Sequence, residues 1–280
     1  MAAKKKSRRN RRESRARSKT FSPKKQELKL KKKLGLTPKV RQFTASKLGE
    51  SVDSNEDSFK VSLAPLTIAL SDGSSRSFKP KKWSSALVSS LSGSQSLLKV
   101  SDIKKISQKV GKLENDNLPW NLEEIRLRGS QATFMRLNLD AQEANLKINC
   151  LSIGDSLLVL QSTSDSKSSN PTTRSWPFET LQDFPNAPSV VSSIEPFLVR
   201  NSQRKQSFKV NRDDFIYLMT DALARYWVEQ NIVGKNIHQI FPFLSNQNDA
   251  QSSFEVWAKE SRTLGLVEDD DLTIIEISLS

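Results

Sequence analysis

LTIALSDGSSRSFKPKKWSSALV, residues 66–88, holds a strand, a turn and the start of a helix in immediate succession. The apolar run at its beginning is typical of a buried strand. Asp72-Gly73 favours a turn, and Pro80 suits the first turn of a helix. That helix places its large apolar residues on one face: Trp83, Leu87, Val88 and Leu91. The stretch therefore predicts a buried strand and an amphipathic helix with an acidic turn between them.

Further strands are predicted on both sides of this stretch. They cover SFKVSLAP, which ends at Pro65, and residues 132–139, 144–153, 155–162, 215–220 and 271–279. The second, third and fourth of these read as an antiparallel meander. FIYLMT, over 215–220, is apolar throughout, so we expect it to be buried on both faces.

Helices are predicted between these groups of strands. Ser101 caps one of them, another follows residue 220, and a third covers Phe254 to Leu264. Residues 163–175 form a polar loop. Because the predicted elements show no regular β-α-β alternation along the chain, the pattern favours an α+β fold with antiparallel sheets covered by helices.

The first 47 residues differ sharply from the rest of the chain. Residues 1–47 carry 19 lysines and arginines against two acidic residues, a net charge of +17, whereas the whole chain carries +13. Self-repulsion and the lack of an apolar face predict a disordered basic arm over 1–47, dispensable for the folding of a domain over 48–280. Such an arm attracts nucleic acid or another polyanion nonspecifically. Anionic lipid and a merely solvated tail are the alternatives.

Cysteine and histidine usage limits the chemistry. Cys150 is the single cysteine and His238 the single histidine. No internal disulfide can form, which favours a reducing, cytoplasmic location. A zinc site of the usual type is excluded, so a bound metal would need oxygen ligands. We expect no membrane span, because no apolar run reaches the necessary length.

Acidic residues recur at the ends of the predicted strands: Asp57, Asp72, Asp155, Asp221 and Asp269 to Asp271. In stacked sheets such carboxylates would converge and repel one another unless a cation neutralises them. Hard cations such as Mg²⁺, Mn²⁺ and Ca²⁺ prefer oxygen ligands. Each residue also has a simpler interpretation, as a plain turn, a hairpin residue, a helix cap or part of a solvated loop.

Several segments, taken in order, resemble the successive motifs of bacterial type 2C metal-dependent serine/threonine protein phosphatases. They are SNEDSF, ALSDGSSRSFKPKKWSSALV, GSQATFMRLNL, CLSIGDSLLVL, FIYLMTDALARYW and EDDDLTIIEI. The resemblance covers residues 48–280 and is closest to a divergent branch. It implies a four-layer sandwich of two antiparallel sheets flanked by helices. It also implies that a metal-bridging hydroxide hydrolyses phosphoserine or phosphothreonine in a phosphoprotein.

The resemblance assigns metal-binding roles to particular residues. Two ions, Mn²⁺ or Mg²⁺, would be held by Glu56, Asp57, Asp72, the carbonyl of Gly73, Asp221 and Asp270. Within this set, Glu56 and Asp57 match an acidic pair that acts directly or through water, and Asp72 matches the bridging carboxylate. Asp155 resembles an acid at a third, weaker site.

The chain departs from the family pattern at two places. Many members follow Asp-Gly with His-Gly-Gly, whose histidine is a candidate proton donor, but Ser74, Ser75 and Arg76 follow here. Val52 stands where many members have a phosphate-binding arginine, and Arg76 is a candidate replacement. We therefore expect a weak or narrow phosphatase. The alternatives are a non-catalytic phosphatase-like binding or regulatory module, and a polyanion-binding protein acting through its arm.

Overall fold

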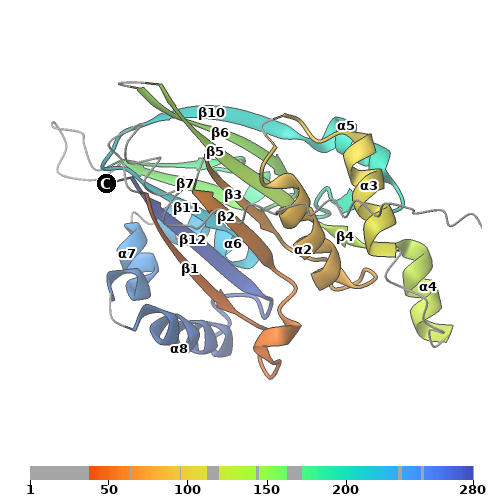
Figure 1. Ribbon diagram of the computed structural model, residues 1–280. Coiled ribbons are helices and arrows are strands. Elements are labelled where there is room, and N and C mark those ends of the chain that lie inside the picture. Colours follow the sequence, from red (N-terminus) through yellow and green to blue (C-terminus); the bar gives the residue numbers. More distant parts are fainter. Residues whose placement is uncertain are drawn as a thin grey trace, which may run out of the picture.

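The computed structural model describes residues 38–63, 65–94, 96–111, 120–142, 145–162, 172–232, 235–246 and 249–279. Two five-stranded sheets stack on each other, and helices cover the outer face of each (Figure 1). The first sheet has the order β1 (Lys39–Ala45), β12 (Leu272–Ser278), β11 (Phe215–Met219), β7 (Leu157–Ser162) and β8 (Thr172–Trp176). The second has the order β10 (Arg204–Val210), β6 (Asn145–Ile153), β5 (Phe134–Gln142), β3 (Leu66–Ser71) and β2 (Ser58–Leu63).

All strand pairs in both sheets are antiparallel. A small ribbon pairs β4 (Gln131–Ala132) with β9 (Val191–Ser192). The α-helices are α2 (Pro80–Leu91), α3 (Val100–Gly111), α4 (Trp120–Arg128), α5 (Val199–Ser202), α6 (Asp221–Ile232), α7 (Ile237–Ile240) and α8 (Ala250–Thr263). Short 3₁₀ turns are η1 (Val52–Ser54), η2 (Leu181–Asp183), η3 (Pro196–Leu198) and η4 (Pro242–Ser245).

Three apolar clusters hold the layers together. The middle cluster joins the inner faces of the two sheets and includes Leu137 of β5 and Leu218 of β11. A second cluster packs α6, α7 and α8 on the first sheet through residues such as Trp227. A third packs α2 and α3 on the second sheet around Trp83. The predicted four-layer α+β sandwich is therefore confirmed.

The boundary of the predicted basic arm is wrong. Lys39–Ala45, which we assigned to it, forms β1 and pairs along its whole length with β12. Phe43 is buried beneath this strand, and the guanidinium of Arg41 donates to both oxygens of Glu276, over 2.8 and 2.7 Å. The basic residues of this segment make it resemble the disordered arm in sequence. The strand becomes apparent only in the fold, where Phe43 is buried and Glu276 of β12 pairs with Arg41. Residues 1–37 lie outside the described part of the chain.

The predicted meander is correct for two strands and wrong for the third. β5 and β6 pair as a hairpin, but β7 leaves them and joins the first sheet beside β11. Gly154 lies at the crossing point with φ +107°, a conformation that side chains disfavour. FIYLMT is confirmed as a central strand, since β11 pairs with β12 on one side and β7 on the other. The predicted loop over 163–175 ends earlier, because β8 begins at Thr172.

Within the described residues, no helix combines the length and apolar character that crossing a bilayer requires.

Candidate metal centre

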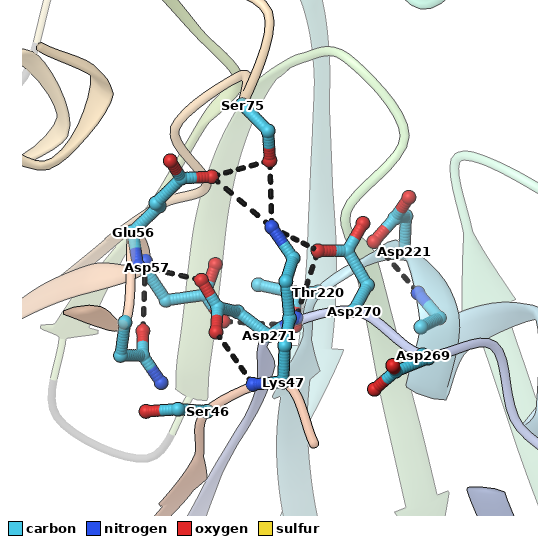
Figure 2. Close-up of polar contacts among 12 residues, drawn as sticks. Ser46, Lys47, Glu56, Asp57, Ser75, Thr220, Asp221, Asp269, Asp270 and Asp271 are labelled. Atoms are coloured by element: carbon cyan, nitrogen blue, oxygen red, sulfur yellow. Dashed lines mark hydrogen bonds and ion pairs between the residues drawn. The ribbon is translucent and has the colours of Figure 1, made fainter. Parts of the chain in front are cut away.

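The ends of several strands carry acidic residues to one region of the sandwich. Asp57 precedes β2 and Asp72 follows β3, while Asp155 lies at the crossing from β6 to β7. Asp221 begins α6 directly after β11, and the 269–271 loop leads into β12. Figure 2 shows Glu56 and Asp270 beside the Lys47 ammonium and Asp271 beside its backbone N–H, with Asp57 and Asp221 in the same region. The strand-end pattern thus brings together residues that lie far apart in the sequence.

Asp57 is buried, whereas Asp72 and Asp221 are half-buried. Asp57 is 4% exposed, and its Oδ1 has no hydrogen-bond partner in the described part of the chain. Its Oδ2 accepts a 3.3 Å hydrogen bond from the Thr220 hydroxyl, which itself accepts from the backbone N–H of Thr273. Burial raises the pKa of the Asp57 carboxyl to about 7; the Thr273 and Thr220 hydroxyls oppose this increase, and the charges of Asp271 and Asp270 support it. A buried carboxylate oxygen without a partner is a natural ligand for a cation.

The neighbouring carboxylates show the same mutual repulsion. Burial raises the pKa of Asp72 well above its usual value, and the charges of Asp57 and Asp221 contribute most of the further increase. The pKa of Asp221 rises to about 8 through burial and the charges of Asp155 and Asp270, although the Ala222 N–H opposes this. Burial also raises the pKa of Asp155. The pKa of each of these three carboxyls is therefore raised in part by the negative charges of other acidic residues nearby.

Gly73 fixes the turn that presents Asp72. A Cβ at this position would lie 2.8 Å from the backbone carbonyl carbon of Pro80, which is too close for any side chain. Thr133 holds the same turn from the other side, since its N–H donates to the Asp72 carbonyl over 2.8 Å. The Asp72 N–H donates to the Thr133 hydroxyl over 3.2 Å. Asp72 is therefore held between β3 and the start of α2.

The 269–271 loop is held to two other segments by its own carboxylates. Asp271 accepts from the N–H groups of Lys47, over 3.2 Å, and Glu56, over 2.6 Å. Asp269 accepts from the Leu48 N–H. Asp270 also has partners, since its Oδ1 accepts a 2.8 Å hydrogen bond from the Asp271 N–H and lies 3.1 Å from the Lys47 ammonium.

Lys47 lies at the middle of this set, and sequence reasoning missed it. Its ammonium group is 3.3 Å from Glu56 Oε2 and 3.1 Å from Asp270 Oδ1 (Figure 2). It also donates to the Ser75 hydroxyl over 2.6 Å, and Ser75 in turn donates to Glu56. The charges of Asp270 and Glu56 outweigh the effect of burial and raise the pKa of Lys47, so it stays protonated at ordinary pH. The predicted basic arm over residues 1–47 ends at this lysine.

The residues considered for substrate binding and proton transfer lie apart from the carboxylates. Arg76 is exposed and, within the described part of the chain, makes no hydrogen bond or ion pair with the carboxylates, whereas Ser75 beside it lies within the centre. Val52 lies in η1 and is 76% exposed. His238 lies on α7 with its Nδ1 3.4 Å from the Ser245 hydroxyl, so it faces a neighbouring turn of the helical layer.

The chemistry of this donor set fits a hard cation, because its members are oxygen ligands. The pKa values of Asp57, Asp72, Asp155 and Asp221 are raised, and Asp57 Oδ1 has no hydrogen-bond partner among the described residues. The arrangement of these side chains is less complete than their chemistry. Among the described residues, no three acidic, cysteine or histidine side chains lie together as a ligand shell for a metal ion. The Lys47 ammonium lies within ion-pair distance of two of the carboxylates, Glu56 and Asp270.

No family model matches the chain, and no curated protein sequence matches it. Solved structures do. The catalytic domain of the serine/threonine phosphatase PstP, in complex with two manganese ions, superposes with a TM-score of 0.55 at 14% identity over 87% of this chain and 99% of that one. Stp1 from Staphylococcus aureus gives 0.54 at 14% identity over 86% of this chain and 95% of that one. PstP from Mycobacterium tuberculosis gives 0.51 at 15% identity, over 87% and 99%.

The similarity covers nearly the whole of each of these solved chains. At 14–15% sequence identity it establishes the fold and nothing further. The chain therefore has the fold of the bacterial type 2C serine/threonine phosphatases.

Proposed function

We propose that this chain is a metal-dependent phosphoprotein phosphatase acting on phosphoserine or phosphothreonine, with weak activity or narrow specificity. The observation that carries the proposal is the meeting of Asp57, Asp72 and Asp221 on a phosphatase fold. A scaffold has no need for buried carboxylates that raise one another's pKa values, since their repulsion costs stability. A cation site does need them.

Glu56, Asp57, Asp72, Asp221 and Asp270, with the Gly73 carbonyl, would hold two ions of Mn²⁺ or Mg²⁺, and Asp155 would serve a third. Such ions, when bound, activate water and neutralise phosphoryl oxygens. The chain's own contribution is to fix these ligands: the Gly73 turn orients Asp72, and the Thr220 hydroxyl orients Asp57. Asp271 joins the segments that carry Glu56 and Lys47.

The proton for the leaving alkoxide has no obvious donor in the described part of the centre. The chain's single histidine lies on α7, and Ser75 is bound to Glu56 and Lys47. A missing general acid costs ~10²–10⁴-fold and matters least when the leaving group is already acidic. We therefore expect an aryl phosphate to be hydrolysed far faster than a phosphoserine peptide.

The test is hydrolysis of p-nitrophenyl phosphate and of a phosphoserine peptide by the full-length chain, with and without Mn²⁺. We expect turnover of the aryl phosphate that requires Mn²⁺ and is lost in Asp72→Asn. Asp140→Asn, at an exposed position on β5, is the matched control and should retain activity. Turnover that persists in Asp72→Asn, or no turnover with any divalent ion, would reject the catalytic proposal.

A second candidate is a phosphatase-like domain that binds a phosphoprotein without hydrolysing it. The ion pairs of Lys47 with Glu56 and Asp270, and the exposed Val52, favour it. Binding of a phosphoserine peptide that remains intact after prolonged incubation with Mn²⁺ would select this candidate.

A further inference from the structure

The most unusual feature of the centre is a lysine among carboxylates that would otherwise be metal ligands. The Lys47 ammonium has three hydrogens to donate. Its three near neighbours are Glu56 Oε2 at 3.3 Å, Asp270 Oδ1 at 3.1 Å and Ser75 Oγ at 2.6 Å (Figure 2). Every donor is therefore matched by a protein oxygen. None is left over for a substrate phosphate, so the ammonium is positioned as an internal cation.

The backbone around Lys47 fixes this position. The Lys47 N–H donates to Asp271 Oδ1, and the next N–H, of Leu48, donates to Asp269 Oδ1. On the other side, the Ser46 carbonyl accepts a 2.8 Å hydrogen bond from Arg262. The Lys47 side chain is only 19% exposed. The chain thus directs this ammonium to the carboxylates and does not leave it free at the surface.

We propose that the Lys47 ammonium competes with one of the two proposed divalent ions, so that the native centre binds one ion tightly and a second ion only weakly. The inference rests on the proposed metal centre. Lys47 neutralises Glu56 and Asp270, whereas Asp57 Oδ1 lacks any partner among the described residues. A divalent ion that uses Glu56 and Asp270 must first separate both ion pairs. An ion that uses Asp57, Asp72 and Asp221 meets no such competitor.

The proposal is tested by counting the ions bound. The full-length chain is stripped with a chelator and titrated with Mn²⁺ alone in a calorimeter, and free Mn²⁺ is followed by electron paramagnetic resonance. We expect one tight ion in the native chain. Lys47→Met, which keeps the length of the side chain and removes its charge, should gain a second ion or bind the weaker one at least about fivefold more tightly.

Three further variants serve as controls. Lys47→Arg keeps the positive charge and should behave like the native chain, and Lys47→Gln repeats the loss of charge should Lys47→Met fail to fold. Lys60→Met makes the same charge change at a lysine whose ammonium donates to the Ser89 carbonyl and, among the described residues, pairs with no carboxylate; it should leave binding unchanged.

The outcomes separate this inference from the proposed function. Equal stoichiometry and equal affinity in the native chain, Lys47→Met and Lys47→Gln would overturn the role of Lys47 and leave the metal centre standing. Binding of no Mn²⁺ by the folded native chain and both variants would overturn the metal centre itself. An additional ion that binds only after Lys47 is replaced, beside the tight ion of the native chain, would support the inference.

Discussion

Thr220 shows how a single hydroxyl prepares the centre. It donates to Asp57 and accepts from the Thr273 N–H, so it ties the carboxylate to the first residues of β12. We expect Thr220→Val to weaken Mn²⁺ binding by about 10–100-fold, the usual effect of losing a group that orients a metal ligand. Thr67→Val is the matched control, because Thr67 is equally buried but bonds Asn138 within the second sheet. Equal losses of affinity in both variants would show a general packing effect.

The raised pKa values predict an unusual dependence of stability on pH. The pKa values of Asp57 and Asp221 rise to about 7 and 8 in the folded chain, so the folded state holds protons that the unfolded state releases near pH 4. With a chelator present, the free energy of unfolding should therefore fall as pH rises from about 4 to 8. Differential scanning calorimetry should show a lower melting temperature at pH 8 than at pH 5.5, and Mn²⁺ should reduce the difference. A melting temperature that rises over this range would contradict the repulsion.

For single residues, the sequence identifies the acidic members of the centre better than the side chains that bind them. Asp57, Asp72, Asp155 and Asp221 could be singled out because strand ends are visible as changes in the apolar pattern. Lys47 could not, since its carboxylate partners include Asp270, more than 200 residues away. A lysine within a basic segment carries no local sign that the fold will bury it among acids.

At the scale of elements, β1 marks where the domain begins. Deleting residues 1–37 should leave the melting temperature nearly unchanged and remove most of the retention on a polyanion column. Deleting 1–45 also removes β1, and losing the buried Phe43 alone costs ~3–5 kcal/mol. We expect the shorter chain to lose its cooperative unfolding transition, as followed by circular dichroism. Equal stability of the two truncated chains would show that β1 contributes little to the first sheet.

The strands themselves were largely predictable, but some of their partners were not. Apolar runs located β3, β5, β6, β7, β11 and β12. The short connection at Asp155 is compatible with a hairpin, and only the packing of the second sheet decides that β7 crosses to the first. The sequence pattern does not reveal β10, because RKQSFKV is mostly polar and mostly exposed. An edge strand of this kind has backbone pairing without an apolar pattern.

For the whole molecule, the stacking of two sheets is what concentrates the charge. Asp57 and Asp72 belong to segments of the second sheet, Asp221 and Asp270 to segments of the first, and Asp155 to the crossing between them. The sandwich can form only if these carboxylates meet, so their repulsion opposes folding unless protons, Lys47 or a divalent ion offset it. A cation that binds the folded chain alone must stabilise it.

The most direct test of this account is the melting temperature of the full-length chain with and without millimolar Mn²⁺. At one hundred times the dissociation constant, binding adds ~2.7 kcal/mol, or roughly 5–10 °C for a domain of this size. We predict that rise for the native chain and its absence in Asp72→Asn, which should be at least as stable as the metal-free native chain because one repelling charge is gone. A small rise of equal size in both proteins would contradict the claim that these carboxylates form a metal centre.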